Sequence, residues 1–169
     1  MDLRVIFILT LVFAGAAAAD GGAHVHGEAR LDIAAEADSV YIEFESPAAN
    51  LVGFEHAPQN SPQRRALRQA ARTLAGAEDW LRFAGADCHL QEAGVEAPHG
   101  EKEETRHRAH FSFHASYHFQ CDNLAQLDSV AVALFASFPG IHEIAVQWLA
   151  PGRQGAVSLT AQDNELQLK

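Results

Sequence analysis

Apolar and polar residues alternate with a period of two in two segments near the N-terminus. Residues 28–35 read EARLDIAA and residues 40–45 read VYIEFE. This alternation predicts two half-buried β-strands, and the EADS sequence at 36–39 predicts the turn of a hairpin between them. The second strand ends at Ser46-Pro47, because proline cannot donate a hydrogen bond to a neighbouring strand.

Three other segments have apolar residues at helical spacing. Residues 61–75 predict a helix that begins at Ser61, a suitable N-cap, and ends at Gly76. Residues 78–83 predict a short second helix. Residues 124–138 predict a third helix, because apolar residues recur three or four apart until a Pro-Gly pair.

The remaining segments predict further strands and one loop. Residues 94–105 are polar and predict a loop. The strands are expected at residues 86–92, 106–121, 141–149, 156–160 and 165–168. Strand pairs interrupted by helices indicate an α+β fold, a mostly antiparallel β-sheet with two to three helices packed on one face.

The strand expected at 106–121, RHRAHFSFHASYHFQC, is dense in aromatic residues and histidine. In an extended strand, alternate side chains point to opposite faces. The face predicted to line the core carries Phe111, Phe113, Ala115, Tyr117, Phe119 and Cys121. The opposite face carries the histidines His110, His114 and His118.

The first nineteen residues have the features of a secretory signal peptide. Arg4 precedes an apolar run at 5–13, and small residues at 17–19 precede Asp20. The run is too short to span a bilayer comfortably. The sequence therefore predicts a cleaved signal at 1–19, a single domain at 20–169 and no stable membrane insertion after cleavage; an uncleaved anchor is the alternative.

The mature chain contains two cysteines, Cys88 and Cys121. Export to an oxidising compartment favours a disulfide between them over the alternative of two buried thiols. If the two face each other across an antiparallel strand pair, residues whose numbers sum to 209 are opposite. His99 would then oppose His110, and His89 would oppose Gln120.

The charge balance argues against nucleic acid as a partner. Lys and Arg total 12 against 22 Asp and Glu, which gives a formal net charge of -10. The one cluster of arginines falls on the helix expected at 61–75, where a solvated helix face is the simplest interpretation.

Ten histidines in 169 residues make metal binding the first chemical hypothesis, because neutral imidazole is a common zinc ligand. Spacing limits the role of His110, His114 and His118. Residues four apart on a strand are separated by about 13 Å, so these three cannot share one ion unless a second strand or the loop at His99 reaches them.

His24-Val25-His26 is the better chelating pair. Residues two apart on a strand project to one face about 7 Å apart, and such rings can converge on one zinc ion. Glu55-His56 offers a loop carboxylate and imidazole that can complete the shell, or can serve only as local hydrogen-bonding groups. His142, at the start of an expected strand, is interpreted as a solvated or internally satisfied histidine.

Other classes of function have less support. The sequence contains no GxSxG, HExxH or CxxC motif and no glycine-rich phosphate loop, which argues against an enzyme. Three alternatives stay open: a site for copper or another divalent metal, a zinc-hydroxide hydratase or hydrolase, and an interaction domain with incidental histidines. A thioether Cu(I) site is excluded, because Met1 is the only methionine.

Several stretches together resemble one known family. They are HVHGEARLDIA at the expected mature N-terminus, SPAANLVGFEHAP at 46–58, AGADCHL, FHASYHFQC, and the segment LFASFPGIHEIAVQWLAPGRQGAVSL. The chain is similar in them to the ZrgA-like periplasmic zinc-binding proteins. The resemblance implies a role in zinc acquisition or buffering beside an ABC importer, and points to His24, His26, Glu55 and His56 as functional positions.

One departure from the family lies before the strand histidines. Family members often carry a long loop rich in His, Asp and Glu, whereas this chain has EAPHGEKEETRHRAH. Fewer ligands imply a lower zinc capacity. The sequence thus predicts a monomeric periplasmic accessory protein that binds Zn²⁺ and has a zinc ABC importer, or its solute-binding protein, as partner.

Overall fold

The computed structural model describes residues 26–98 and 111–168. Six strands form the main sheet, in the order β4-β5-β2-β1-β7-β8, and three form a second sheet, in the order β3-β6-β9. The main strands are β1 (Glu28–Glu36), β2 (Ser39–Pro47), β4 (Asp87–Glu96), β5 (Ser112–Asp122), β7 (Glu143–Ala150) and β8 (Arg153–Leu159). The second sheet contains β3 (Leu81–Ala84), β6 (Ser129–Val132) and β9 (Glu165–Gln167).

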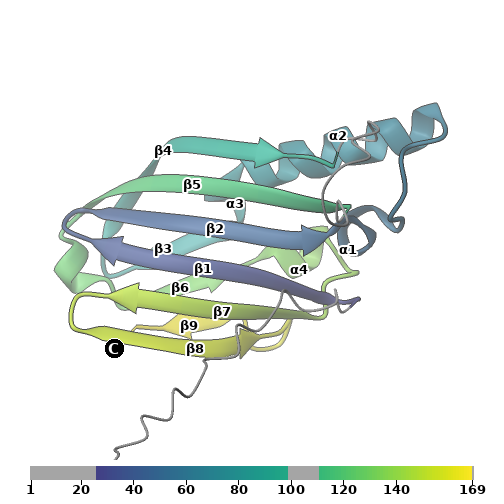
Figure 1. Ribbon diagram of the computed structural model, residues 1–169. Helices are drawn as coiled ribbons and strands as arrows, with labels where there is room; N and C mark the ends of the chain where they lie inside the picture. The colour runs from purple at the N-terminus through teal and green to yellow at the C-terminus, as the bar shows by residue number, and fades with distance from the viewer. Residues whose placement is uncertain (1–25, 99–110, 169) are drawn as a thin grey trace, which may run out of the picture.

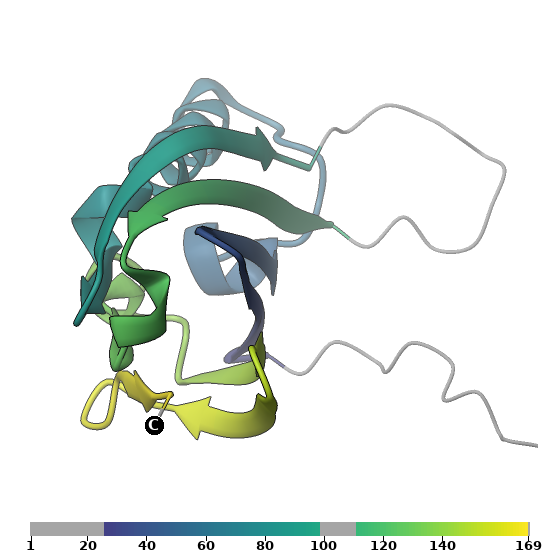
Figure 2. The same ribbon diagram turned by 90° about the vertical axis from the view of Figure 1, so that its left-hand side faces the viewer.

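The helices are α1 (Ala48–Val52), α2 (Ser61–Ala75), α3 (Ala77–Trp80) and α4 (Leu134–Ser137), with a 3₁₀ turn at Leu124–Gln126. Figure 1 shows the main sheet in front of the second sheet and of α2, α3 and α4. Figure 2, turned by 90°, shows how strongly the main sheet curves. The α+β class is confirmed, with four helices within the described ranges where two to three were expected.

The main sheet is mostly antiparallel, as expected, but it is mixed and not purely antiparallel. β1 and β7 pair in parallel, with Glu28 opposite Glu143, while the other four described pairs of this sheet are antiparallel. A parallel pair requires a crossover, and here the chain between β1 and β7 contains most of the other elements.

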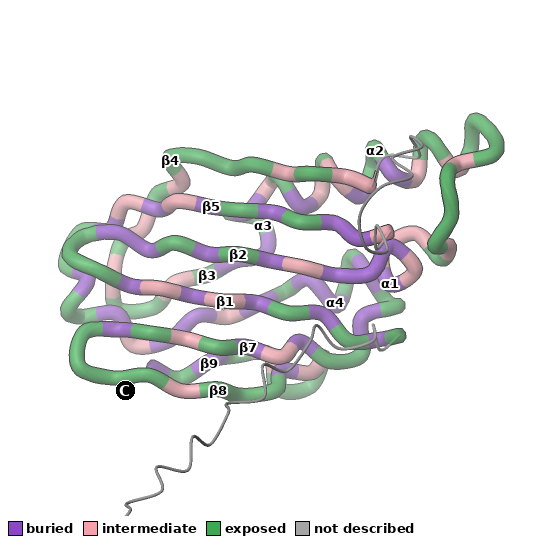
Figure 3. The backbone as a smooth tube through the Cα atoms, in the orientation of Figure 1, coloured by how far each residue is buried: buried purple, intermediate pink, exposed green. Residues whose placement is uncertain are grey.

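Burial alternates along the main strands, as Figure 3 shows. Leu31, Ile42 and Phe119 are among the buried side chains that face the helices and the second sheet. The opposite face, which we name the open face, carries charged and polar side chains together with the exposed Tyr41 and Leu149. On β5 the predicted core face is confirmed, because Phe113, Ala115, Tyr117, Phe119 and Cys121 are all buried while His114 is exposed.

Helix α2 has the predicted bounds but a different cap. The N-cap is Asn60, whose side-chain oxygen accepts a hydrogen bond from the Gln63 amide at 2.9 Å, while Ser61 is the first helical residue. Leu67, Ala70 and Leu74 form its buried stripe. Its four arginines are exposed, as a solvated helix face requires.

The helix predicted at 124–138 is wrong. The segment is divided into the 3₁₀ turn, β6 and α4, because Val130 and Val132 are both buried between β3 and β9. The short helix predicted at 78–83 is also cut short, since α3 ends at Trp80 and the chain continues directly into β3.

The disulfide between Cys88 and Cys121 is present, and the two residues oppose each other on β4 and β5. The predicted register holds through His89 opposite Gln120 and Leu90 opposite Phe119. An irregularity then shifts it by one residue, so that Glu92 opposes His118. β4 also continues to Glu96, into the segment predicted as a polar loop.

Across the described parts of the chain, helices are too short or too polar to cross a membrane.

Candidate metal-binding site

The segment that enters β1 is held in place by one buried side chain. Asn50 of α1 accepts a hydrogen bond from the Gly27 amide at 2.8 Å and donates to the Glu28 carbonyl at 2.8 Å and to the Ser46 hydroxyl at 3.1 Å. Asn50 is only 5% exposed, so these bonds form away from water. The backbone beside His26 is therefore fixed to α1.

His26 lies against the loop that follows α1. Its Nε2 atom is 3.2 Å from the Glu55 Oε1 atom. The two side chains are 72% and 38% exposed, so an ion from solvent can reach them. The helix ends at Gly53, which has a φ of 81° in the left-handed region and directs the chain toward Glu55. The structure thus brings together two residues that the sequence pointed to separately.

His56 is the next residue of this loop and is also exposed. Its Nδ1 atom is 2.9 Å from the Ala57 carbonyl oxygen. A carbonyl oxygen only accepts hydrogen bonds, so Nδ1 must carry the proton, and in the neutral ring Nε2 keeps a lone pair for a metal. The ring contacts Phe54, with ring centroids 5.1 Å apart.

His142 lies at the same end of the main sheet as His26, immediately before β7. The Gly27 carbonyl accepts hydrogen bonds from the amides of His142 at 2.7 Å and Glu143 at 3.0 Å. The His142 ring lies over Gly27, where an added Cβ atom would be 2.7 Å from its Nδ1 atom. The sequence did not indicate a ligand role for this histidine, because the parallel register of β1 and β7 has no local signal.

The strand histidines occupy a different part of the molecule, on the open face. His114 lies between Glu45 of β2 and Glu96 of β4, which are its cross-strand partners. His118 stacks on Tyr41 with ring centroids 4.7 Å apart. The structure therefore does not bring His114 and His118 to the His26–Glu55 pair.

His24, His99 and His110 lie outside the described residues, as does the predicted opposition of His99 and His110.

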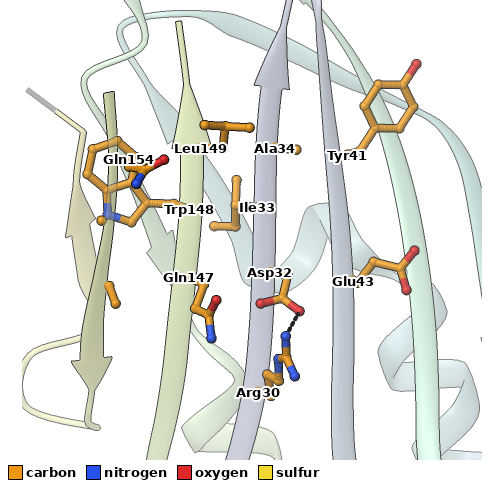
Figure 4. Close-up of a pocket in the computed structure, with 12 residues that line it drawn as sticks. Arg30, Asp32, Ile33, Ala34, Tyr41, Glu43, Gln147, Trp148, Leu149 and Gln154 are labelled. Carbon is orange, nitrogen blue, oxygen red and sulfur yellow. Dashed lines mark ion pairs between the residues drawn. The ribbon is translucent and has the colours of Figure 1, made fainter. Parts of the chain in front are cut away.

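A pocket of about 670 Å³ also lies on the main sheet. Figure 4 shows Tyr41 on one side of it, Trp148 and Leu149 on the other, and the ion pair of Arg30 and Asp32 at 2.9 Å. None of the residues that line it is a histidine or cysteine. The carboxylates of Asp32 and Glu43 line it without an imidazole or thiolate beside them, so it lacks the nitrogen and sulfur ligands typical of zinc sites.

Comparison with known proteins gives the family. A family model described as ZrgA family zinc uptake protein matches residues 23–168. The chain belongs to this family. The resemblance noted from HVHG and SPAANLVGFEHAP is thereby confirmed. No curated protein matches the chain.

Membership of the ZrgA family associates the chain with zinc uptake, with the ion as cargo. Among the residues that the structure describes, no three His, Cys, Asp or Glu side chains gather closely enough to hold a metal ion. The donor types around His26 nevertheless fit zinc, since imidazole nitrogen and carboxylate oxygen are both usual ligands. In this ZrgA family protein, the candidate site is centred on the exposed pair of His26 and Glu55.

Proposed function

We propose that this protein is a periplasmic zinc-binding accessory protein that takes up free Zn²⁺ and holds it for, or passes it to, an ABC importer. The observation that carries the proposal is the pair of His26 and Glu55 at 3.2 Å, exposed at the end of the main sheet. The family match to zinc uptake proteins supports the choice of zinc.

The chemistry of the pair suits reversible binding. Imidazole and carboxylate form a moderately strong site in which the imidazole must be neutral, so protons compete with the metal. Both groups are open to solvent, which suits an ion that has to enter and leave. His56 extends the site, because its Nε2 atom is available for a metal. The protein acts in this proposal as a monomeric carrier and not as an enzyme.

Calorimetric titration of residues 20–169 with zinc, at about pH 7.5 and about pH 5.5, tests the proposal. We expect binding tighter than about 10 μM at the higher pH and a clear loss of affinity at the lower pH. The His26→Ala variant should lose at least about tenfold in affinity at the higher pH.

His89 supplies a matched control. It is also an exposed histidine beside a carboxylate, with Nε2 3.6 Å from the Asp87 Oδ1 atom, but it lies on β4. The His89→Ala variant should bind zinc as the wild type does. The proposal fails if the wild type binds more weakly than about 10 μM at the higher pH, or if His26→Ala and His89→Ala have the same affinity.

A further inference from the structure

We propose that His142 binds the same zinc ion as His26 and Glu55. This inference rests on the proposed function and adds to it a ligand from a third segment of the chain. His142 is exposed and its ring lies against Gly27, the residue next to His26.

The backbone fixes the two histidines at one level of the sheet. β1 and β7 pair in parallel from Glu28 and Glu143 onward, so His26 and His142 both lie in the segments that lead into these neighbouring strands. The Gly27 carbonyl accepts hydrogen bonds from the amides of His142 and Glu143, which joins the two segments directly. The backbones of the two segments are therefore held side by side.

Asn50 supports both segments and is a positioning residue in this proposal. Its side chain holds Gly27 and Glu28, as described above. The segment that leads to β7 packs on the backbone of the same residue, because a Cβ atom at Gly140 would collide with the Asn50 carbonyl oxygen. One buried residue thus supports the backbones that carry both imidazoles.

The His142 ring lies close to the backbone of His26. A Cβ atom on Gly27 would be 2.7 Å from the His142 Nδ1 atom. Since consecutive Cα atoms are about 3.8 Å apart, that nitrogen lies within about 8 Å of the His26 Cα atom. Nitrogen ligands of one tetrahedral zinc ion are separated by about 3.5 Å. The proposal therefore requires the two exposed side chains to rotate toward each other when the ion binds.

The neighbouring groups leave His142 available for this role. Within the described part of the chain, its ring makes no hydrogen bond or ion pair. The adjacent Glu143 is engaged elsewhere, because its Oε1 atom accepts a hydrogen bond from the Ser158 hydroxyl at 2.6 Å. Gly27 suits the arrangement in two ways. Its φ of 89° favours glycine, and a Cβ atom there would displace the His142 ring from its present position.

The test compares the wild type with His26→Ala, His142→Ala, the double variant and His89→Ala in zinc titrations at about pH 7.5. We expect His142→Ala to weaken the site at least about tenfold, as His26→Ala does, and His89→Ala to leave it unchanged. If both histidines bind one ion, the double variant should lose less affinity than the product of the two single losses. Urea unfolding without metal shows whether each variant keeps its fold.

A second measurement does not depend on a variant. In the wild type, the ring ¹⁵N resonances of His26 and His142 should shift together at the same zinc equivalents, while those of His89 stay in place. The inference is overturned if His26→Ala weakens binding but His142→Ala does not, or if the His142 resonances are unmoved by zinc. Absence of zinc binding by the wild type would instead overturn the proposed function itself.

Discussion

The disulfide should be the largest single contribution to the stability of this domain that one chemical change can remove. Cys88 and Cys121 oppose each other on β4 and β5, and their positions in the sequence are 33 apart. Among the strands that the structure describes, β4 is at an edge of the main sheet and has β5 as its only neighbour there. Replacing both cysteines with alanine keeps the hydrogen bonds of the pair and removes the crosslink.

The magnitude follows from loop closure. In the chain-entropy model, a crosslink that closes a loop of this length lowers the entropy of the unfolded chain enough to stabilise the fold by about 3 to 4 kcal/mol. A domain of this size has a total unfolding free energy of about 5 to 15 kcal/mol. Loss of the crosslink therefore removes a large part of the total without removing the core.

Urea unfolding followed by circular dichroism measures the effect. With a slope of about 2 kcal/mol/M, the midpoint of the Cys88→Ala, Cys121→Ala variant should fall by about 2 M relative to the oxidised wild type. Reductant should move the wild type to the midpoint of the variant and leave the variant itself unchanged. A loss below about 1 kcal/mol, with an unchanged slope, would refute the reasoning, because the unfolded chain would not have gained the expected freedom.

Two further predictions concern pH and zinc. Burial raises the pKa of the Tyr117 hydroxyl above its ordinary value of 10.0, so the folded state should lose stability as the pH rises past about 10, where the unfolded chain ionises first. Urea unfolding of Tyr117→Phe should show a smaller loss of stability at alkaline pH. At neutral pH the variant should be less stable by about 1 kcal/mol, because the hydrogen bond to the Leu74 carbonyl at 3.0 Å is lost. An equal loss of stability at alkaline pH in both proteins would contradict this prediction. Zinc at one hundred times its dissociation constant should stabilise the wild type by about 2.7 kcal/mol in urea unfolding, and no shift would mean that the unfolded chain binds zinc equally well.

The elements that the sequence predicted well are those whose pattern is local. β1 and β2 alternate residue by residue, and their hairpin places Glu36 opposite Ser39 as the EADS turn requires. Helix α2 has a continuous apolar stripe and clear boundaries. In these segments one face is buried along the whole length, so the period of the pattern determines the type of element.

The segment 124–138 shows where such patterns fail. Leu124, Leu127, Val130 and Leu134 have helical spacing and are all buried, but Val130 and Val132 also fit a period of two. The choice is made by distant partners, because β6 lies between β3 and β9 and gains backbone hydrogen bonds from both. The tertiary context therefore overrides a local helical pattern.

The candidate site was predictable only in part for the same reason. The HVHG and GFEH segments drew attention to His26 and Glu55, and the structure places these two side chains 3.2 Å apart. No pattern in the sequence relates either of them to His142, since that relation depends on the parallel pairing of β1 with β7. Ligand types can be recognised in a sequence, whereas their grouping depends on strand order.

The geometry of strands explains why the densest run of histidines is not where a chelating site is expected. On β5, His114 and His118 are held four residues apart, and each has partners of its own, Glu45 and Glu96 for the first and Tyr41 for the second. Side chains at the ends of strands have fewer such restrictions, because the backbone there turns and separate segments converge. The segment that enters β1 and the loop after α1 therefore place two ligands side by side. On a single strand, residues four apart stay about 13 Å from each other.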